Sequence, residues 1–164
     1  MGIHDVALEV EVGKLLREKG LKLAVAESCT GGLVADRLTD IPGSSEYFLG
    51  GIVAYAYEAK VALLGVSWDT LRAHGAVSRE TVLEMARGAR QALGADIGIS
   101  VSGIAGPGGG LPNKPVGTTW LGLSTAANER AYQLTFAGDR RVNKEEAATA
   151  ALRVLRDYLS DASA

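Results

Sequence analysis

The sequence is poor in cysteine and histidine. Among its 164 residues it has one cysteine, Cys29, and two histidines, His4 and His74. A lone cysteine cannot close an intramolecular disulfide, and these three residues show none of the spacings that zinc ligands have. We therefore expect no metal, no cofactor and a reducing compartment, the cytoplasm.

An excess of charge and long apolar runs are also lacking. The chain has 17 basic and 19 acidic residues and a formal net charge of -2. No run of like charge would bind a nucleic acid or a membrane surface, and no apolar run approaches the length that spans a bilayer. The N-terminal residues include Glu9 and Glu11 and do not form a signal peptide. We expect neither a nucleic acid nor a membrane as partner, so that any anionic ligand must be held by local groups.

The chain length and a hydrophobic content of 47% suit one domain, which we expect over residues 1–164. Apolar periodicity and glycine positions predict strands over 21–26, 47–55, 97–102, 118–124 and 131–136. They predict helices over 57–64, 79–93 and about 143–159, with two earlier helices that end at 19 and near 39. Because helices alternate with the first strands and two strands then follow in succession, we expect a three-layer α/β/α domain with a mixed sheet of about five strands.

The first chemically suggestive segment is residues 27–32, Glu-Ser-Cys-Thr-Gly-Gly. Ser28 follows a predicted buried strand and precedes a helix, which places its hydroxyl at a sheet edge near the N–H groups of the next turn. Such N–H groups could hold an oxyanion. The alternative is that Ser28 and Thr30 are helix caps and that Gly31 and Gly32 serve close packing.

A serine hydroxyl needs a base before it becomes a nucleophile. His4 lies near the N-terminus and His74 in a polar turn, so a serine-histidine-aspartate triad is not expected. Lys60 is the best candidate because it lies within an apolar stretch, and burial would lower its pKa. The alternatives are that Lys60 is an ordinary surface lysine and that Cys29 is the nucleophile or a small buried residue.

The second segment is the glycine-rich stretch from Gly103 to Gly110. Its glycines let main-chain N–H groups approach a ligand closely, although a plain connecting loop is an equal alternative. It is neither a phosphate-binding loop of the Gly-Lys-Ser type nor a dinucleotide fingerprint. Arg140 and Arg141, expected just before the last helix, offer planar donors for a phosphate, unless they are a solvated surface pair.

Taken together, five ordered motifs resemble the CinA C-terminal domain family over nearly the whole chain. They are Ala-Glu-Ser-Cys-Thr-Gly-Gly (26–32), Tyr-Ala-Tyr-Glu-Ala-Lys (55–60), Ser-Gly-Ile-Ala-Gly-Pro-Gly-Gly (102–109), Lys-Pro-Val-Gly-Thr (114–118) and Gly-Asp-Arg (138–140). The resemblance implies a nicotinamide-nucleotide amidase of pyridine nucleotide salvage, which hydrolyses nicotinamide mononucleotide to nicotinic acid mononucleotide and ammonia. It places Ser28 on the nucleophile, Lys60 on the base and Tyr55 on its helper.

The residues expected to contact the substrate lie in the same motifs. They are Glu27, Thr30, Gly31, Gly32, Ser102, Gly103, Gly106 and Arg140. Lys144 stands where the family often has a second arginine, which keeps the charge but loses the planar fork. Many members carry a larger molybdopterin-binding-like domain in front, and we expect a stand-alone amidase here. The alternative function is a non-catalytic nucleotide-binding module, as in a competence-associated protein. The oligomeric state stays open, a homo-oligomer included.

Overall fold

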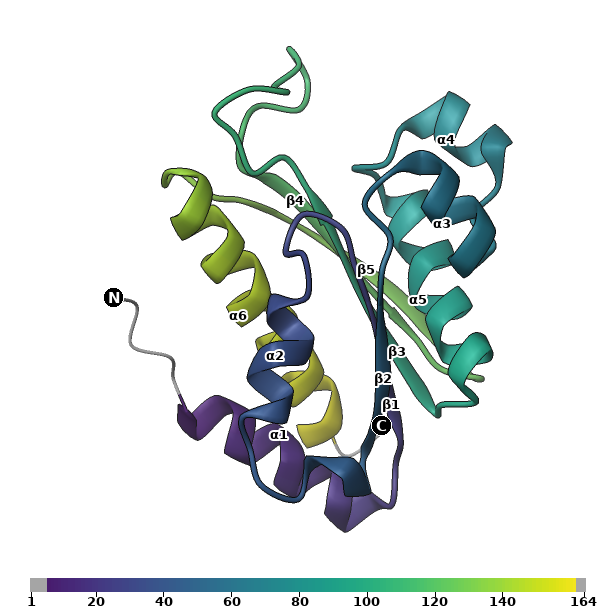
Figure 1. Ribbon diagram of the computed structural model, residues 1–164, viewed down its shortest axis with the longest axis vertical. Helices are drawn as coiled ribbons and strands as arrows, with labels where there is room; N and C mark the ends of the chain where they lie inside the picture. The colour runs from purple at the N-terminus through teal and green to yellow at the C-terminus, as the bar shows by residue number, and fades with distance from the viewer. Residues whose placement is uncertain (1–5, 162–164) are drawn as a thin grey trace.

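A computed structural model describes residues 6–161 of the chain. A five-stranded sheet with the order β2-β1-β3-β4-β5 lies between two layers of helices (Figure 1). The strands are β1 (Leu23–Glu27), β2 (Phe48–Val53), β3 (Ile97–Gly103), β4 (Thr118–Ser124) and β5 (Glu129–Thr135). The first three are mutually parallel, whereas β4 and β5 each run antiparallel to the preceding strand. The expected three-layer α/β/α architecture with a mixed sheet is confirmed.

The helices divide between the two faces of the sheet (Figure 1). One face is covered by α1 (Val6–Lys19), α2 (Leu33–Thr39) and α6 (Arg140–Ser160), and the other by α3 (Tyr57–Leu64), α4 (Trp68–His74) and α5 (Arg79–Leu93). Strand β1 contributes side chains to the cores on both faces of the sheet. Leu23 and Val25 pack in the core under α1 and α6, whereas Ala24 and Ala26 pack in the core under α5. No helix within residues 6–161 is long and apolar enough to cross a membrane.

Four local features differ from the sequence-based expectation. The seven-residue helix α4, capped by Ser67, and the short 3-10 helix Ser44–Glu46 were not predicted, because α4 buries only Leu71 and shows no apolar stripe. Strand β5 begins at Glu129 rather than 131. Helix α6 begins at Arg140 rather than near 143, because the Asp139 carboxylate accepts a hydrogen bond from the Val142 N–H (2.9 Å) and caps it there.

Helix α5 packs directly on the sheet because the contact is built from glycine and small residues. A Cβ atom added at Gly98 of β3 would overlap the carbonyl oxygen of Ala86, and one at Gly122 of β4 would overlap that of Val82. The Ser100 hydroxyl donates a hydrogen bond to the same Val82 carbonyl (2.6 Å). The helix backbone therefore rests on the strand backbone, which leaves no room for larger side chains.

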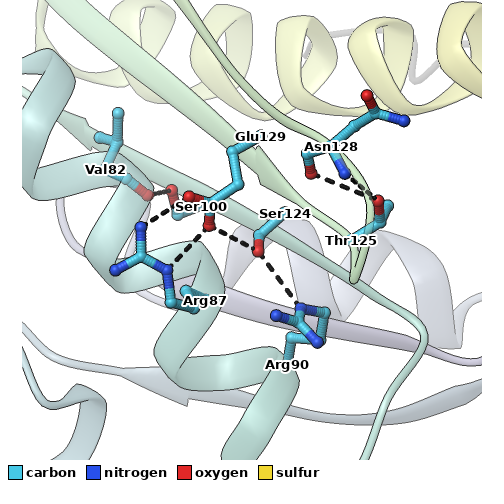
Figure 2. Close-up of polar contacts among 8 residues, drawn as sticks. All are labelled: Val82, Arg87, Arg90, Ser100, Ser124, Thr125, Asn128 and Glu129. Carbon is cyan, nitrogen blue, oxygen red and sulfur yellow. Dashed lines mark hydrogen bonds and ion pairs between the residues drawn. The ribbon is translucent and has the colours of Figure 1, made fainter.

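Polar contacts fix the C-terminal half of α5 to the far end of the sheet (Figure 2). Arg87 donates two hydrogen bonds to the Glu129 carboxylate (2.9 and 2.6 Å), which lower the pKa of Glu129. Ser124 donates to the same carboxylate (2.9 Å) and accepts a hydrogen bond from Arg90 (3.2 Å). These contacts orient α5 along the strands, so that its N-terminus, capped by Ser78, lies at the opposite end of the sheet.

Candidate active site

The carboxyl ends of β1, β2 and β3 meet at one edge of the sheet, where parallel strands commonly place ligands. A cleft of about 270 Å³ lies at this edge. It brings together seven of the predicted site residues: Ser28, Tyr55, Lys60, Ser102, Gly103, Gly106 and Arg140. The other four, Glu27, Thr30, Gly31 and Gly32, form the turn behind Ser28 and do not line the cleft.

Ser28 and Lys60 face each other across the floor of this cleft. The Ser28 N–H continues the β1–β3 pairing by donating to the Val101 carbonyl (3.0 Å), which places Ser28 just beyond the strand end. Lys60 lies on α3, and its Nζ is 2.9 Å from the Ser28 Oγ. The Lys60 residue is 1% exposed, so it is not the surface lysine of the alternative reading.

Two main-chain carbonyls determine how the Lys60 amine is oriented. Its Nζ donates to the carbonyl oxygens of Ala54 and Tyr55, both at 2.9 Å. Burial lowers the pKa of Lys60 from 10.5 to about 8. A neutral amine has two N–H bonds and one lone pair, and carbonyl oxygens can only accept hydrogen bonds. When both N–H bonds point at these carbonyls, the lone pair faces the Ser28 hydroxyl and can accept its proton.

The N-terminus of α2 does not hold an oxyanion, contrary to expectation. The Glu27 carboxylate, 1% exposed, accepts hydrogen bonds from the N–H groups of Gly32 (3.2 Å), Val34 (2.9 Å) and Ala35 (3.0 Å). It also accepts one from the Thr30 hydroxyl (2.6 Å). Because a side chain of the protein already uses these donors, they are not available to a substrate.

Tyr55 and Arg140 meet at the mouth of the cleft although they are far apart in the sequence. The Arg140 guanidinium donates to the Tyr55 hydroxyl (3.1 Å) and to the Gly106 carbonyl (2.7 Å). Tyr55 is 60% exposed, and only its main-chain carbonyl contacts Lys60. Tyr55 therefore orients Lys60 through its backbone, while its ring and hydroxyl belong to the rim of the cleft.

Comparison of the chain with known proteins identifies the family to which it belongs. The family model described as the CinA C-terminal domain matches residues 5–159. The chain belongs to the CinA C-terminal domain family. It is 52% identical over 160 residues to a CinA-like protein of Chloroherpeton thalassium and 53% identical over 156 residues to one of Chlorobaculum tepidum. These alignments cover 95% and 92% of this chain but 38% and 37% of the relatives. The chain thus spans less than half the length of the curated relatives it matches.

Solved structures of CinA-family proteins share the fold. Competence damage-inducible protein A from Klebsiella pneumoniae superposes with a TM-score of 0.92 and 37% identity, covering 96% of this chain and 98% of that one. The competence/damage inducible protein CihA from Agrobacterium tumefaciens gives 0.89 and 37%, covering 98% of this chain and 100% of that one.

In this CinA domain Cys29 lies beside Ser28 but is poorly suited to act as a nucleophile. It lines the cleft, yet it is only 7% exposed. Burial raises the pKa of its thiol to about 11. Because the thiolate is the reactive form, a thiol with this pKa is almost entirely unreactive at neutral pH.

The structure also places the residues that sequence reasoning missed or set aside. Ala76 and Val77, just before α5, form one wall of the CinA cleft, and no chemical signal in these apolar residues could have identified them. His74 ends α4 with its Nδ1 3.6 Å from Glu80 Oε2 and does not line the cleft, while His4 lies outside the described residues. Within residues 6–161 no group of three or more histidine, cysteine or acidic side chains could hold a metal ion.

Proposed function

We propose that this chain is a nicotinamide-nucleotide amidase that converts nicotinamide mononucleotide and water to nicotinic acid mononucleotide and ammonia, with residues 1–164 as a single amidohydrolase domain. The observation that carries the proposal is the Ser28–Lys60 pair, 2.9 Å apart and buried, with the pKa of the amine lowered to about 8. The family resemblance supplies the substrate. The pair supplies a nucleophile with its base already in hydrogen-bond contact.

The reaction proceeds in two steps through an acyl-enzyme. The Ser28 Oγ attacks the carboxamide carbon while neutral Lys60 takes the hydroxyl proton, and the tetrahedral intermediate forms. Its C–N bond breaks as Lys60 returns that proton to the departing nitrogen, which leaves as ammonia. Water then attacks the ester with Lys60 again acting as base. The carboxylate product departs and the Ser28 hydroxyl is restored.

The glycine-rich loop is the source of oxyanion donors in this mechanism. The N–H groups of α2 are occupied by Glu27, so the developing negative charge needs donors from elsewhere. In the part of the chain that the structure describes, the N–H groups of Ala105, Gly106 and Gly108 donate to no other protein group, and all three residues line the cleft. We assign the oxyanion to this loop.

The charges of the cleft favour an anionic substrate. Its lining residues include the Arg140 cation and, among the described residues, no carboxylate. Within residues 6–161, Arg140 hydrogen-bonds only neutral oxygens, and it lies in the first turn of α6, where the helix dipole disfavours a cation. A phosphate beside Arg140 would neutralise the charge of the guanidinium and accept hydrogen bonds from two of its N–H groups. Lys144 lies one turn further along α6, close to Gly31, and does not line the cleft.

The deciding experiment measures ammonia released by the purified protein from nicotinamide mononucleotide, with nicotinamide riboside as the matched substrate that lacks phosphate. We expect release from the mononucleotide and much slower release from the riboside. Binding of the mononucleotide without any release of ammonia would instead support the non-catalytic nucleotide-binding module.

Replacement of Cys29 by serine tests the rival nucleophile. We expect Cys29→Ser to keep its turnover number within about threefold of wild type, because the buried thiol is protonated at neutral pH. The measurement is the ammonia assay at saturating substrate, with circular dichroism as the control for folding. A folded but inactive Cys29→Ser protein would move the nucleophile to the thiol.

A further inference from the structure

Glu27 is an unusual buried charge because its partners are hydrogen-bond donors of the neighbouring turn and helix. Its carboxylate accepts hydrogen bonds from the Thr30 hydroxyl and from the N–H groups of Gly32, Val34 and Ala35. No lysine or arginine of the described residues forms an ion pair with it. Four donors and the positive end of the α2 dipole offset the cost of burying this carboxylate.

The backbone of Glu27 is held separately by the sheet. Its carbonyl accepts a hydrogen bond from the Ala54 N–H (2.9 Å), and Ser28 next to it donates to Val101 (3.0 Å). The main chain therefore fixes one end of the turn 28–32 to β3, while the Glu27 carboxylate fixes the other end through Thr30 and Gly32. Ser28 lies inside this closed loop.

We call the hydrogen bonds that the Glu27 carboxylate accepts the Glu27 clamp. The turn 28–32 needs this restraint because it contains two glycines in the left-handed region. Gly31 has φ 62° and Gly32 has φ 106°. Glycine reaches these angles without steric cost but also leaves them easily. Two main-chain hydrogen bonds close the turn, from the Gly31 N–H to the Ser28 carbonyl (3.1 Å) and from the Leu33 N–H to the Thr30 carbonyl (3.2 Å). The Glu27 side chain adds two further hydrogen bonds to the turn, from the Thr30 hydroxyl and the Gly32 N–H.

We propose that Glu27 is the positioning residue of the nucleophile, holding the turn so that the Ser28 Oγ stays in hydrogen-bond contact with the Lys60 Nζ, rather than a substrate contact. This inference rests on the proposed role of Ser28 as nucleophile. Because Glu27 does not line the cleft, its loss should leave substrate binding intact. Displacing a reacting group by about 1 Å can lower a rate by about 100-fold.

The test variant is Glu27→Gln, which keeps the shape but places an amide NH₂ where N–H donors converge. We expect kcat for nicotinamide mononucleotide to fall about 10- to 100-fold while KM stays within about threefold of wild type. A second readout is covalent labelling of Ser28 by a fluorophosphonate probe. In that reaction an O–P bond forms, the P–F bond breaks, and Lys60 takes the serine proton as fluoride leaves. The labelling rate should fall by a similar factor.

Val34→Ala is the matched control for a purely structural effect. Val34 is fully buried on the same short helix, and its main-chain N–H to Glu27 survives the substitution. We expect Val34→Ala to lower the melting temperature without lowering kcat or the labelling rate. Equal losses of kcat in the two variants at equal losses of stability would overturn the proposal. So would a folded Glu27→Gln protein with wild-type kcat.

If Glu27→Gln does not fold, Thr30→Val removes one of the four hydrogen bonds at nearly constant volume. It should lower the labelling rate about three- to tenfold, and an unchanged rate would count against the clamp. Labelling also separates this inference from the proposed function. A wild-type protein that labels at Ser28 but releases no ammonia would refute the amidase proposal and leave Glu27 to be judged on labelling. A wild-type protein that neither labels nor hydrolyses has no activated nucleophile, which would refute both.

Discussion

Ser28→Ala is expected to lower the turnover number for nicotinamide mononucleotide at least ~100-fold, because it removes the atom that forms the acyl-enzyme and leaves only binding and electrostatic contributions to the rate. The substitution removes one hydroxyl from a residue that is 8% exposed, so the fold should persist. The measurement is ammonia release under saturating substrate, with substrate affinity determined separately by calorimetry. Affinity should change little.

Ser44→Ala serves as the matched control for this experiment, because Ser44 lies in the short 3-10 helix and does not line the cleft. It should retain wild-type turnover. Near-normal turnover by a folded Ser28→Ala protein would refute the mechanism in which Ser28 is the nucleophile.

Lys60→Arg is the second substitution with a large expected effect. A guanidinium stays protonated throughout the accessible pH range and therefore cannot accept the Ser28 proton, although it keeps the positive charge. We expect a loss of activity of at least ~100-fold. In the wild type, kcat/KM should rise with pH through an apparent pKa of about 8, because the active form of Lys60 is the neutral amine and burial lowers its pKa to that value.

The measurement is a pH–rate profile of both proteins, with circular dichroism at each pH as the folding control. The rising limb should be absent from the variant. An active Lys60→Arg protein with an unchanged profile would show that the base is another group and that Lys60 has a different role, such as contact with the phosphate.

The sequence was sufficient to predict the layers and seven of the residues that line the candidate cleft, for identifiable reasons. Apolar runs bounded by glycine marked the buried strands, and a serine directly after such a strand had to lie at the sheet edge. Lys60 was recognisable because a lysine inside an apolar stretch of a helix is a candidate for burial. Its approach to Ser28, 32 residues away, follows from the parallel pairing of β1 with β2.

The features that were not predicted depend on side-chain direction or on weak local signals. Glu27 belongs to the same motif as Ser28, and spacing could not reveal that its carboxylate turns back toward α2 instead of the cleft. The contact between Arg140 and Tyr55 joins residues 85 positions apart and depends on where α6 begins. That start was hidden because Arg140 and Arg141 open the helix and its first turn has no acidic residue.

The buried amine of Lys60 also links the protonation of the protein to its folding equilibrium. In the unfolded chain this lysine has its ordinary pKa of 10.5, and in the folded protein the value is about 8. Between these two pH values the unfolded chain binds more protons at this lysine than the folded one, so the Lys60 contribution to the free energy of unfolding rises with pH. From about pH 9 upward the raised pKa of the buried Cys29 thiol acts in the opposite direction. The penalty for holding a charged amine in the core is complete below about pH 8, absent above 10.5, and on the order of 3 kcal/mol. Between about pH 8 and 9, before the Cys29 thiol of the unfolded chain begins to ionise, a rise in pH therefore both generates the neutral form of Lys60 and removes the cost of burying its charge.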